Sequence, residues 1–145
     1  MFEQRWLIYA LLSAVCAAFV PIFGKVGMKD INDTLATGVR SIIMTLFLIS
    51  LCTFTGVWSK LHTITARPLT MIALSGLAGA TSWLFYFKAL RFGEPTQVAP
   101  IDKMSVPFAA ILAFLLLRDR PTALNWAGII IIAIGAYLAG LPRST

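Results

Sequence analysis

Five long apolar runs, separated by short polar connections, constrain the fold of this chain more than any other feature. They cover residues 6–26, 35–58, 68–90, 95–117 and 123–141. A helix needs about 20 mainly apolar residues to cross roughly 30 Å of hydrocarbon, and each run has about that length. Only 12% of the residues are charged, about half the share in a soluble domain. The sequence therefore predicts an all-α, polytopic membrane protein, with residues 1–145 forming a single domain of about five transmembrane helices in the cell (inner) membrane.

The charge pattern and the motif content exclude several classes of function. The net charge is +6, but the Lys and Arg residues stand singly or in pairs at the ends of apolar runs and form no basic patch for nucleic acid. The sequence contains no His cluster, catalytic triad, metal-ligand spacing or phosphate-binding loop, so we expect no enzyme, metal site or cofactor. A cleaved signal peptide in the first run is disfavoured by the length of that run and by Glu3.

The Lys and Arg residues divide almost evenly between the two sides of the membrane that alternating helices define. Orientation normally follows an excess of Lys and Arg on the cytoplasmic side. Apart from Lys103 within the fourth run, five fall on the side of the N-terminus and six on the other. The first group is Arg5, Lys60, Arg67, Arg118 and Arg120, and the second is Lys25, Lys29, Arg40, Lys88, Arg91 and Arg143. A chain without an excess is either oriented by something else or inserted in both directions, and helix ends a few residues from those predicted here would change the count.

An odd number of helices gives this even distribution a structural meaning. Many secondary transporters contain two repeats of inverted topology, with the substrate site between them near the midplane of the membrane. A five-helix unit followed by a copy of itself is inverted automatically, and this sequence contains one such unit without an internal repeat. We expect the other half to come from a second chain, either an antiparallel copy or a related small membrane protein.

The fourth run carries the strongest site signal, an acid next to a base. Asp102 lies roughly 10 Å along a helix that begins at Pro95, at about 1.5 Å per residue, and Lys103 follows it. Ionisable side chains within the membrane usually face a cavity or a partner. Pro100 and Pro107 bracket the pair, and each removes a backbone donor, as in the broken helices that line binding sites. The pair is a candidate substrate or proton site, or else an internal ion pair that locks helix packing.

Four other polar residues are weaker candidates for the site. Gln97 and Ser105 lie on the same run as the acid–base pair and can supply hydrogen bonds to a substrate. Lys25 and Lys88 fall near the ends of the first and third runs, on the same side of the membrane. These two lysines either line the mouth of a cavity and attract anions or snorkel to the interface.

Aromatic and small residues complete the set of candidates. Trp83 and Tyr86 belong to an aromatic cluster that forms a ligand cage, or else faces lipid or packs against other helices. Arg40 stands about two turns inside the second run, where snorkelling is more awkward. Ala136 and Gly140, four residues apart in the last run, are typical of helices that approach one another closely in lipid.

Short motifs in a fixed order extend along nearly the whole chain. They are Pro21–Gly27, the aromatic-rich Trp83–Gly93, Val98–Lys103, Leu115–Pro121, Asn125–Gly128 and Ile134–Ala136. In this order and spacing they resemble the EamA domain of the drug/metabolite transporter superfamily, in particular its single-domain bacterial and archaeal members. The resemblance implies a transport fold in which two five-helix units pack as inverted repeats.

The resemblance also bears on function. We expect a secondary transporter half that moves a small polar metabolite or drug as an antiparallel homodimer, with the lipid bilayer and a small-molecule substrate as its other partners. Asp102 would bind a proton or cation, and Lys103 would pair with it or hold an anionic group of the substrate. Small multidrug-resistance relatives carry a Glu in the first helix, where this chain has no acid, and Asp119 stands where the family often has Glu. The alternative is a non-transporting membrane subunit, or half of a heteromeric lipid-carrier flippase.

Overall fold

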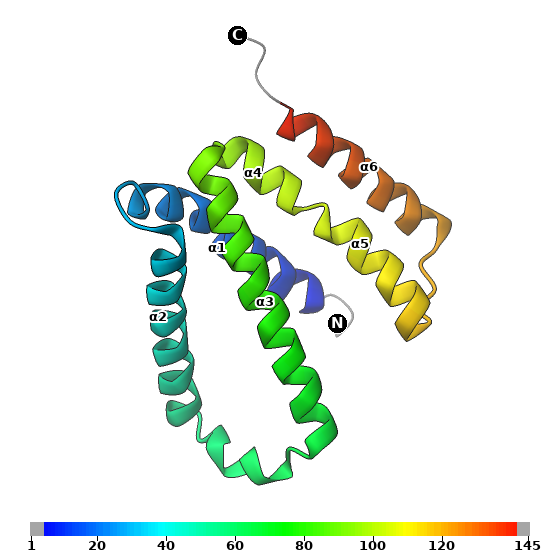
Figure 1. The fold of residues 1–145 in the computed structure, drawn as a ribbon. Coiled ribbons are helices and arrows are strands. Elements are labelled where there is room, and N and C mark those ends of the chain that lie inside the picture. The colour runs from blue at the N-terminus through cyan, green and yellow to red at the C-terminus, as the bar shows by residue number, and fades with distance from the viewer. Residues whose placement is uncertain (1–4, 142–145) are drawn as a thin grey trace. The chain divides into compact units, whose positions relative to one another are not determined.

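Helices of membrane-spanning length make up most of the computed structural model, which describes residues 5–141. In chain order the elements are α1 (Arg5–Gly27), α2 (Asp33–Phe54), η1 (Val57–Thr63), α3 (Ala66–Phe92), α4 (Pro95–Asp102), α5 (Ser105–Leu112), η2 (Ala113–Leu117) and α6 (Ala123–Gly140) (Figure 1). Five stretches are long and apolar enough to span a membrane, with Pro95–Leu117 forming one of them. The predicted all-α fold with five transmembrane helices is confirmed. Glu3 and Arg143 lie outside the described residues.

Local hydrogen bonds set where two of the helices begin. The side-chain oxygen of Asn32 accepts hydrogen bonds from the backbone N–H groups of Thr34 at 2.9 Å and Leu35 at 3.2 Å, and so caps α2. Thr122 and Asn125 cap α6 reciprocally, because each side chain accepts from the backbone N–H of the other residue. The Asn32 cap explains why α2 begins two residues before the apolar run.

The predicted second helix is wrong at its C-terminal end. Hydropathy predicts a helix over residues 35–58, whereas α2 ends at Phe54. Gly56 follows with a φ angle of +67°, and the 3-10 helix η1 begins at Val57. Glycine adopts positive φ without steric cost and often ends a helix, so the segment turns although apolar residues follow. The bounds of the other four predicted helices differ from the observed ones by no more than two residues.

The described chain divides into two compact units. One unit holds residues 5–25 with 92–141, and the other holds residues 26–91. In the first unit, α6 packs along both α4 and α5. In the second unit, the beginning of α2 meets the end of α3 through side chains of both helices.

Gly140 allows α6 to approach α4 closely. A Cβ atom placed on Gly140 would collide with the Cγ1 and Cδ1 atoms of Ile101. Ala136, one turn earlier on α6, is 6% exposed and belongs to the small buried core of the described residues. The predicted small-residue pair therefore includes one position, Gly140, at which a larger side chain fits only if Ile101 moves.

Substituting leucine for Gly140 is expected to destabilise the first unit by about 1–3 kcal/mol, the typical cost of overpacking. Ile101 would have to move or α6 would have to separate from α4. Unfolding of the purified protein in detergent measures the effect. Gly135→Leu is the matched control, because nothing lies within 4 Å of a Cβ at that position. Adding Ile101→Ala to Gly140→Leu should recover part of the loss, and equal effects of the two glycine substitutions would contradict this explanation.

Candidate functional site

The fourth membrane span is broken in its N-terminal half, at residues 103–104 between α4 and α5. The backbone N–H of Lys103 donates to the Pro100 carbonyl at 2.9 Å, and that of Met104 donates to the Ile101 carbonyl at 2.9 Å. These bonds span three residues rather than the four of an α-helix, so they tighten the turn. Pro107 has no N–H with which to reach the Lys103 carbonyl, which accepts from Val106 at 3.0 Å instead.

Asp102 and Lys103 pair with each other at this break. The Lys103 Nζ atom donates to the Asp102 Oδ2 atom at 3.3 Å. The Asp102 side chain is 35% exposed and that of Lys103 is 57% exposed, so atoms of both charged groups remain accessible. An unpaired charge in the centre of a membrane costs a few kcal/mol or more, whereas mutual neutralisation lowers that cost. The geometry fits both alternatives: a site at which Asp102 or Lys103 can bind a proton or substrate in place of the other, and an internal ion pair.

Gln97 and Ser105 lie on either side of the break. Ser105 is the first residue of α5 and is exposed. Gln97 helps to hold the beginning of α4, because its Oε1 atom accepts from the Glu94 backbone N–H at 3.4 Å and its Nε2 atom donates to the Leu141 carbonyl at 3.4 Å. The structure thus gives Gln97 a packing role that the sequence did not predict, and a role of either residue in substrate binding stays a prediction.

Lys25 connects the end of α1 to the connection between α3 and α4. Its Nζ atom donates to the Gly93 carbonyl at 2.8 Å and lies 3.6 Å from the Oε1 atom of Glu94. The Lys25 side chain is 33% exposed. Both of these partners belong to the same unit as Lys25, and a role of Lys25 at the mouth of a cavity stays a prediction. The sequence alone does not identify Glu94 as a partner of Lys25.

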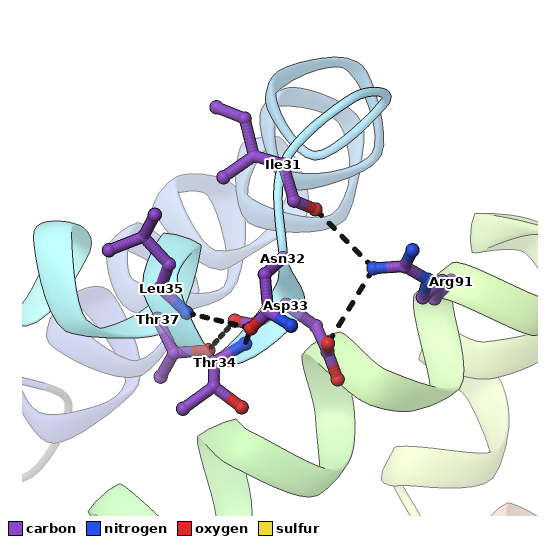
Figure 2. A network of polar contacts seen from close by, with 7 residues as sticks. All are labelled: Ile31, Asn32, Asp33, Thr34, Leu35, Thr37 and Arg91. Atoms are coloured by element: carbon purple, nitrogen blue, oxygen red, sulfur yellow. Dashed lines mark hydrogen bonds and ion pairs between the residues drawn. The ribbon is translucent and has the colours of Figure 1, made fainter.

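A second polar network joins α3 to the start of α2 in the other unit. Figure 2 shows the Arg91 side chain directed at the turn before α2, where its Nη1 atom lies 3.4 Å from the Ile31 carbonyl oxygen and 3.6 Å from the Oδ1 atom of Asp33. The Asp33 side chain is only 17% exposed. Thr37, one turn later on α2, donates from its hydroxyl to the Asp33 carbonyl at 2.8 Å. This network fixes one end of α2 against one end of α3.

The aromatic cluster of α3 holds a cation from α2. The Cζ atom of Arg40 lies 3.7 Å from the centroid of the Trp83 ring and 5.5 Å from that of Phe87. Trp83 and Tyr86 have centroids 5.5 Å apart in an edge-to-face arrangement. A cation over an aromatic face is attracted by the ring, more strongly when water is excluded. The sequence places Arg40 where snorkelling is awkward, but it does not predict the contact of Arg40 with Trp83.

The eight candidate residues thus fall into two groups. Asp102, Lys103, Gln97, Ser105 and Lys25 belong to the first unit, and Trp83, Tyr86 and Lys88 belong to the second. Lys88 is exposed near the end of α3. Within each group the structure brings together Asp102 with Lys103 and Trp83 with Tyr86.

Known proteins resemble the chain over nearly its whole length. Residues 4–141 match the EamA-like transporter family. A protein from Sinorhizobium sp named "Uncharacterized transporter in cobO 3'region" is 42% identical over 136 residues, which cover 94% of this chain and 96% of that protein. No solved structure matches the chain significantly.

Proposed function

Because the chain belongs to the EamA-like transporter family and crosses the membrane several times, we propose that it is one half of a secondary transporter for a small polar metabolite or drug. The working unit is an antiparallel homodimer in the cell (inner) membrane, in which each copy supplies the inverted repeat of the other. The observation that carries the proposal is the Asp102–Lys103 pair at a helix break inside a membrane span.

The pair offers a simple way to couple two solutes. When Asp102 is ionised it holds the Lys103 ammonium, as in the structure. When Asp102 takes up a proton or binds another cation, the ammonium loses its counter-ion and becomes available to an anionic group of the substrate. The partial exposure of both side chains supports this exchange, because it requires that protons and solute reach the pair.

Two observations support an antiparallel partner. The Lys and Arg residues are balanced between the two sides of the membrane, five against six, or five against five without Arg40, which lies inside α2, so neither orientation is preferred. Each unit also leaves most of the large apolar side chains of its spans exposed. Lipid, the other unit or a second chain covers them, and two inverted repeats need a second chain.

The direct test is the membrane orientation of single cysteines. Cys16 and Cys52 are free and are removed first; a cysteine is then placed at Ser59 in η1 or at Asp30 in the turn before α2, both of which are exposed. A membrane-impermeant maleimide applied to intact cells should label about half of the molecules at each position, because orientation without charge bias is divided. Labelling in opened cells gives the total.

Labelling of each position from one face only would rule out the antiparallel homodimer. The proposal would then move to a heteromeric assembly with a related small membrane protein, such as a non-transporting subunit or half of a lipid-carrier flippase. Pull-down with a tagged chain from native membranes would identify that partner.

A further inference from the structure

Arg40 is a charged side chain held inside a membrane span by aromatic rings. It lies about two turns into α2, with its guanidinium 3.7 Å from the Trp83 centroid. Trp83 itself packs against Tyr86 and Phe87, with centroids 5.5 and 5.7 Å away. Phe87 is 3% exposed and anchors the cluster. The rings therefore fix the position of the Arg40 charge.

The Arg40 charge is not neutralised by a carboxylate in the described part of the chain. The ion pairs there join Lys25 to Glu94, Arg91 to Asp33, and Lys103 to Asp102. Asp33, the nearest acid along α2, is thus already engaged. A guanidinium that stacks on a ring through one face still presents N–H donors at its edge, and these match two oxygens of a carboxylate or phosphate.

Arg40 is itself partly exposed, so the guanidinium is not sealed off from a ligand. The polar and cation–π contacts that the structure describes between α2 and α3 lie at residues 33–40 and 83–91. Past this region, residues 41–51 of α2 and residues 66–78 of α3 are all exposed. Arg40 and Trp83 therefore stand at the border between the packed and the uncovered parts of this helix pair.

We propose that Arg40, stacked on Trp83, is an oxyanion-binding site that receives a carboxylate or phosphate group. The inference rests on the proposed transport function in one respect: it assigns the transported solute to the class that carries such a group. A phospholipid headgroup offers the same chemistry, so the experiment must separate a soluble oxyanion from lipid.

The test follows the fluorescence of Trp83 in the purified protein. Phenylalanine replaces the other tryptophans, Trp6, Trp58 and Trp126, so that Trp83 alone reports, and the protein is kept in a phosphate-free maltoside detergent. Acetate and inorganic phosphate are the probes, and acetamide is the neutral match for acetate. Saturable changes with both anions but not with acetamide are expected, and Arg40→Gln should weaken them at least tenfold. Arg40→Lys keeps the positive charge but lacks the paired N–H donors of the guanidinium, so its affinity for the anions should lie between those of the parent protein and Arg40→Gln. Arg67→Gln, an exposed arginine in the first turn of α3, should bind like the parent protein.

The outcomes assign the source of the anion or overturn the site. A response to soluble anions supports a solute site, and a response only to added phosphatidylglycerol micelles supports a headgroup at the same oxyanion site. The inference is overturned if a monodisperse protein gives no saturable fluorescence response to any of the anions. It is also overturned if Arg40→Gln and Arg67→Gln weaken anion binding equally. Since binding is measured in detergent, the result does not depend on whether the chain transports solute as a homodimer.

Discussion

Replacing Asp102 by asparagine is expected to lower transport at least roughly tenfold, about 1.4 kcal/mol in activation free energy, and to remove its dependence on pH. Asparagine preserves the shape and the hydrogen-bonding oxygen of the side chain but cannot take up a proton at neutral pH. The substitution also leaves the Lys103 ammonium without the carboxylate that lies 3.3 Å from it. Both effects act on the same step, in which the Lys103 ammonium exchanges the Asp102 carboxylate for an anionic group of the substrate.

The measurement uses proteoliposomes loaded with a pH-sensitive dye and challenged with pools of small carboxylates, phosphates and amines. This assay reports proton-coupled flux before the solute is identified. Asp102→Glu keeps the titratable group and should retain coupling. Asp119→Asn is the matched control, because Asp119 lies in the connection before α6, where its side chain accepts from the Arg120 backbone N–H at 2.9 Å.

The internal ion-pair alternative makes the opposite prediction for a double substitution. If Asp102 and Lys103 only lock helix packing, replacing both by leucine should preserve transport, because an ion pair held away from water can often be exchanged for apolar residues without loss of stability. Retained pH-dependent flux in Asp102→Asn, or in the double variant, would therefore remove the pair from the transport site.

The five helices could be predicted from sequence because the bilayer imposes a strict length on apolar segments. The same signal fails at helix ends, as the second helix shows. Hydropathy extends this helix through Trp58 because Val57 and Trp58 are apolar, whereas the backbone turns at Gly56. Hydropathy records which residues tolerate lipid, and the end of a helix depends on backbone conformation and capping.

The candidate site was predictable only where its parts are adjacent in sequence. Asp102, Lys103 and the two prolines lie within one run, so their relation follows from helix geometry, although the break itself falls at residues 103–104 rather than at a proline. Arg40 and Trp83 lie on different helices, and their contact depends on how α2 meets α3. Gln97 shows a second limit, since polar residues near a helix start also serve as packing and capping groups.

Fixing the orientation of the chain is expected to abolish transport, and mixing two fixed orientations is expected to restore it. Lys60→Ser with Arg67→Ser lowers the Lys and Arg count on the N-terminal side from five to three, against six on the other. A second variant has the opposite bias. Ser59→Lys and His62→Lys raise the Lys and Arg count on the N-terminal side to seven, and Lys29→Ser lowers the count on the other side to five. Each variant then inserts mainly in one direction, because the side richer in Lys and Arg stays in the cytoplasm. None of these positions belongs to the candidate site.

The two variants have opposite biases, so only cells that make both can form antiparallel pairs. The proteoliposome assay and single-cysteine labelling are applied to each variant alone and to both together. Flux near background for each alone and near the parent level for the mixture is expected. A variant that is fully oriented and still transports at the parental rate excludes an obligatory antiparallel pair. Loss of flux that the opposite variant does not restore, with both chains present in the membrane, excludes it as well, because the inverted repeat would then have to come from a different chain.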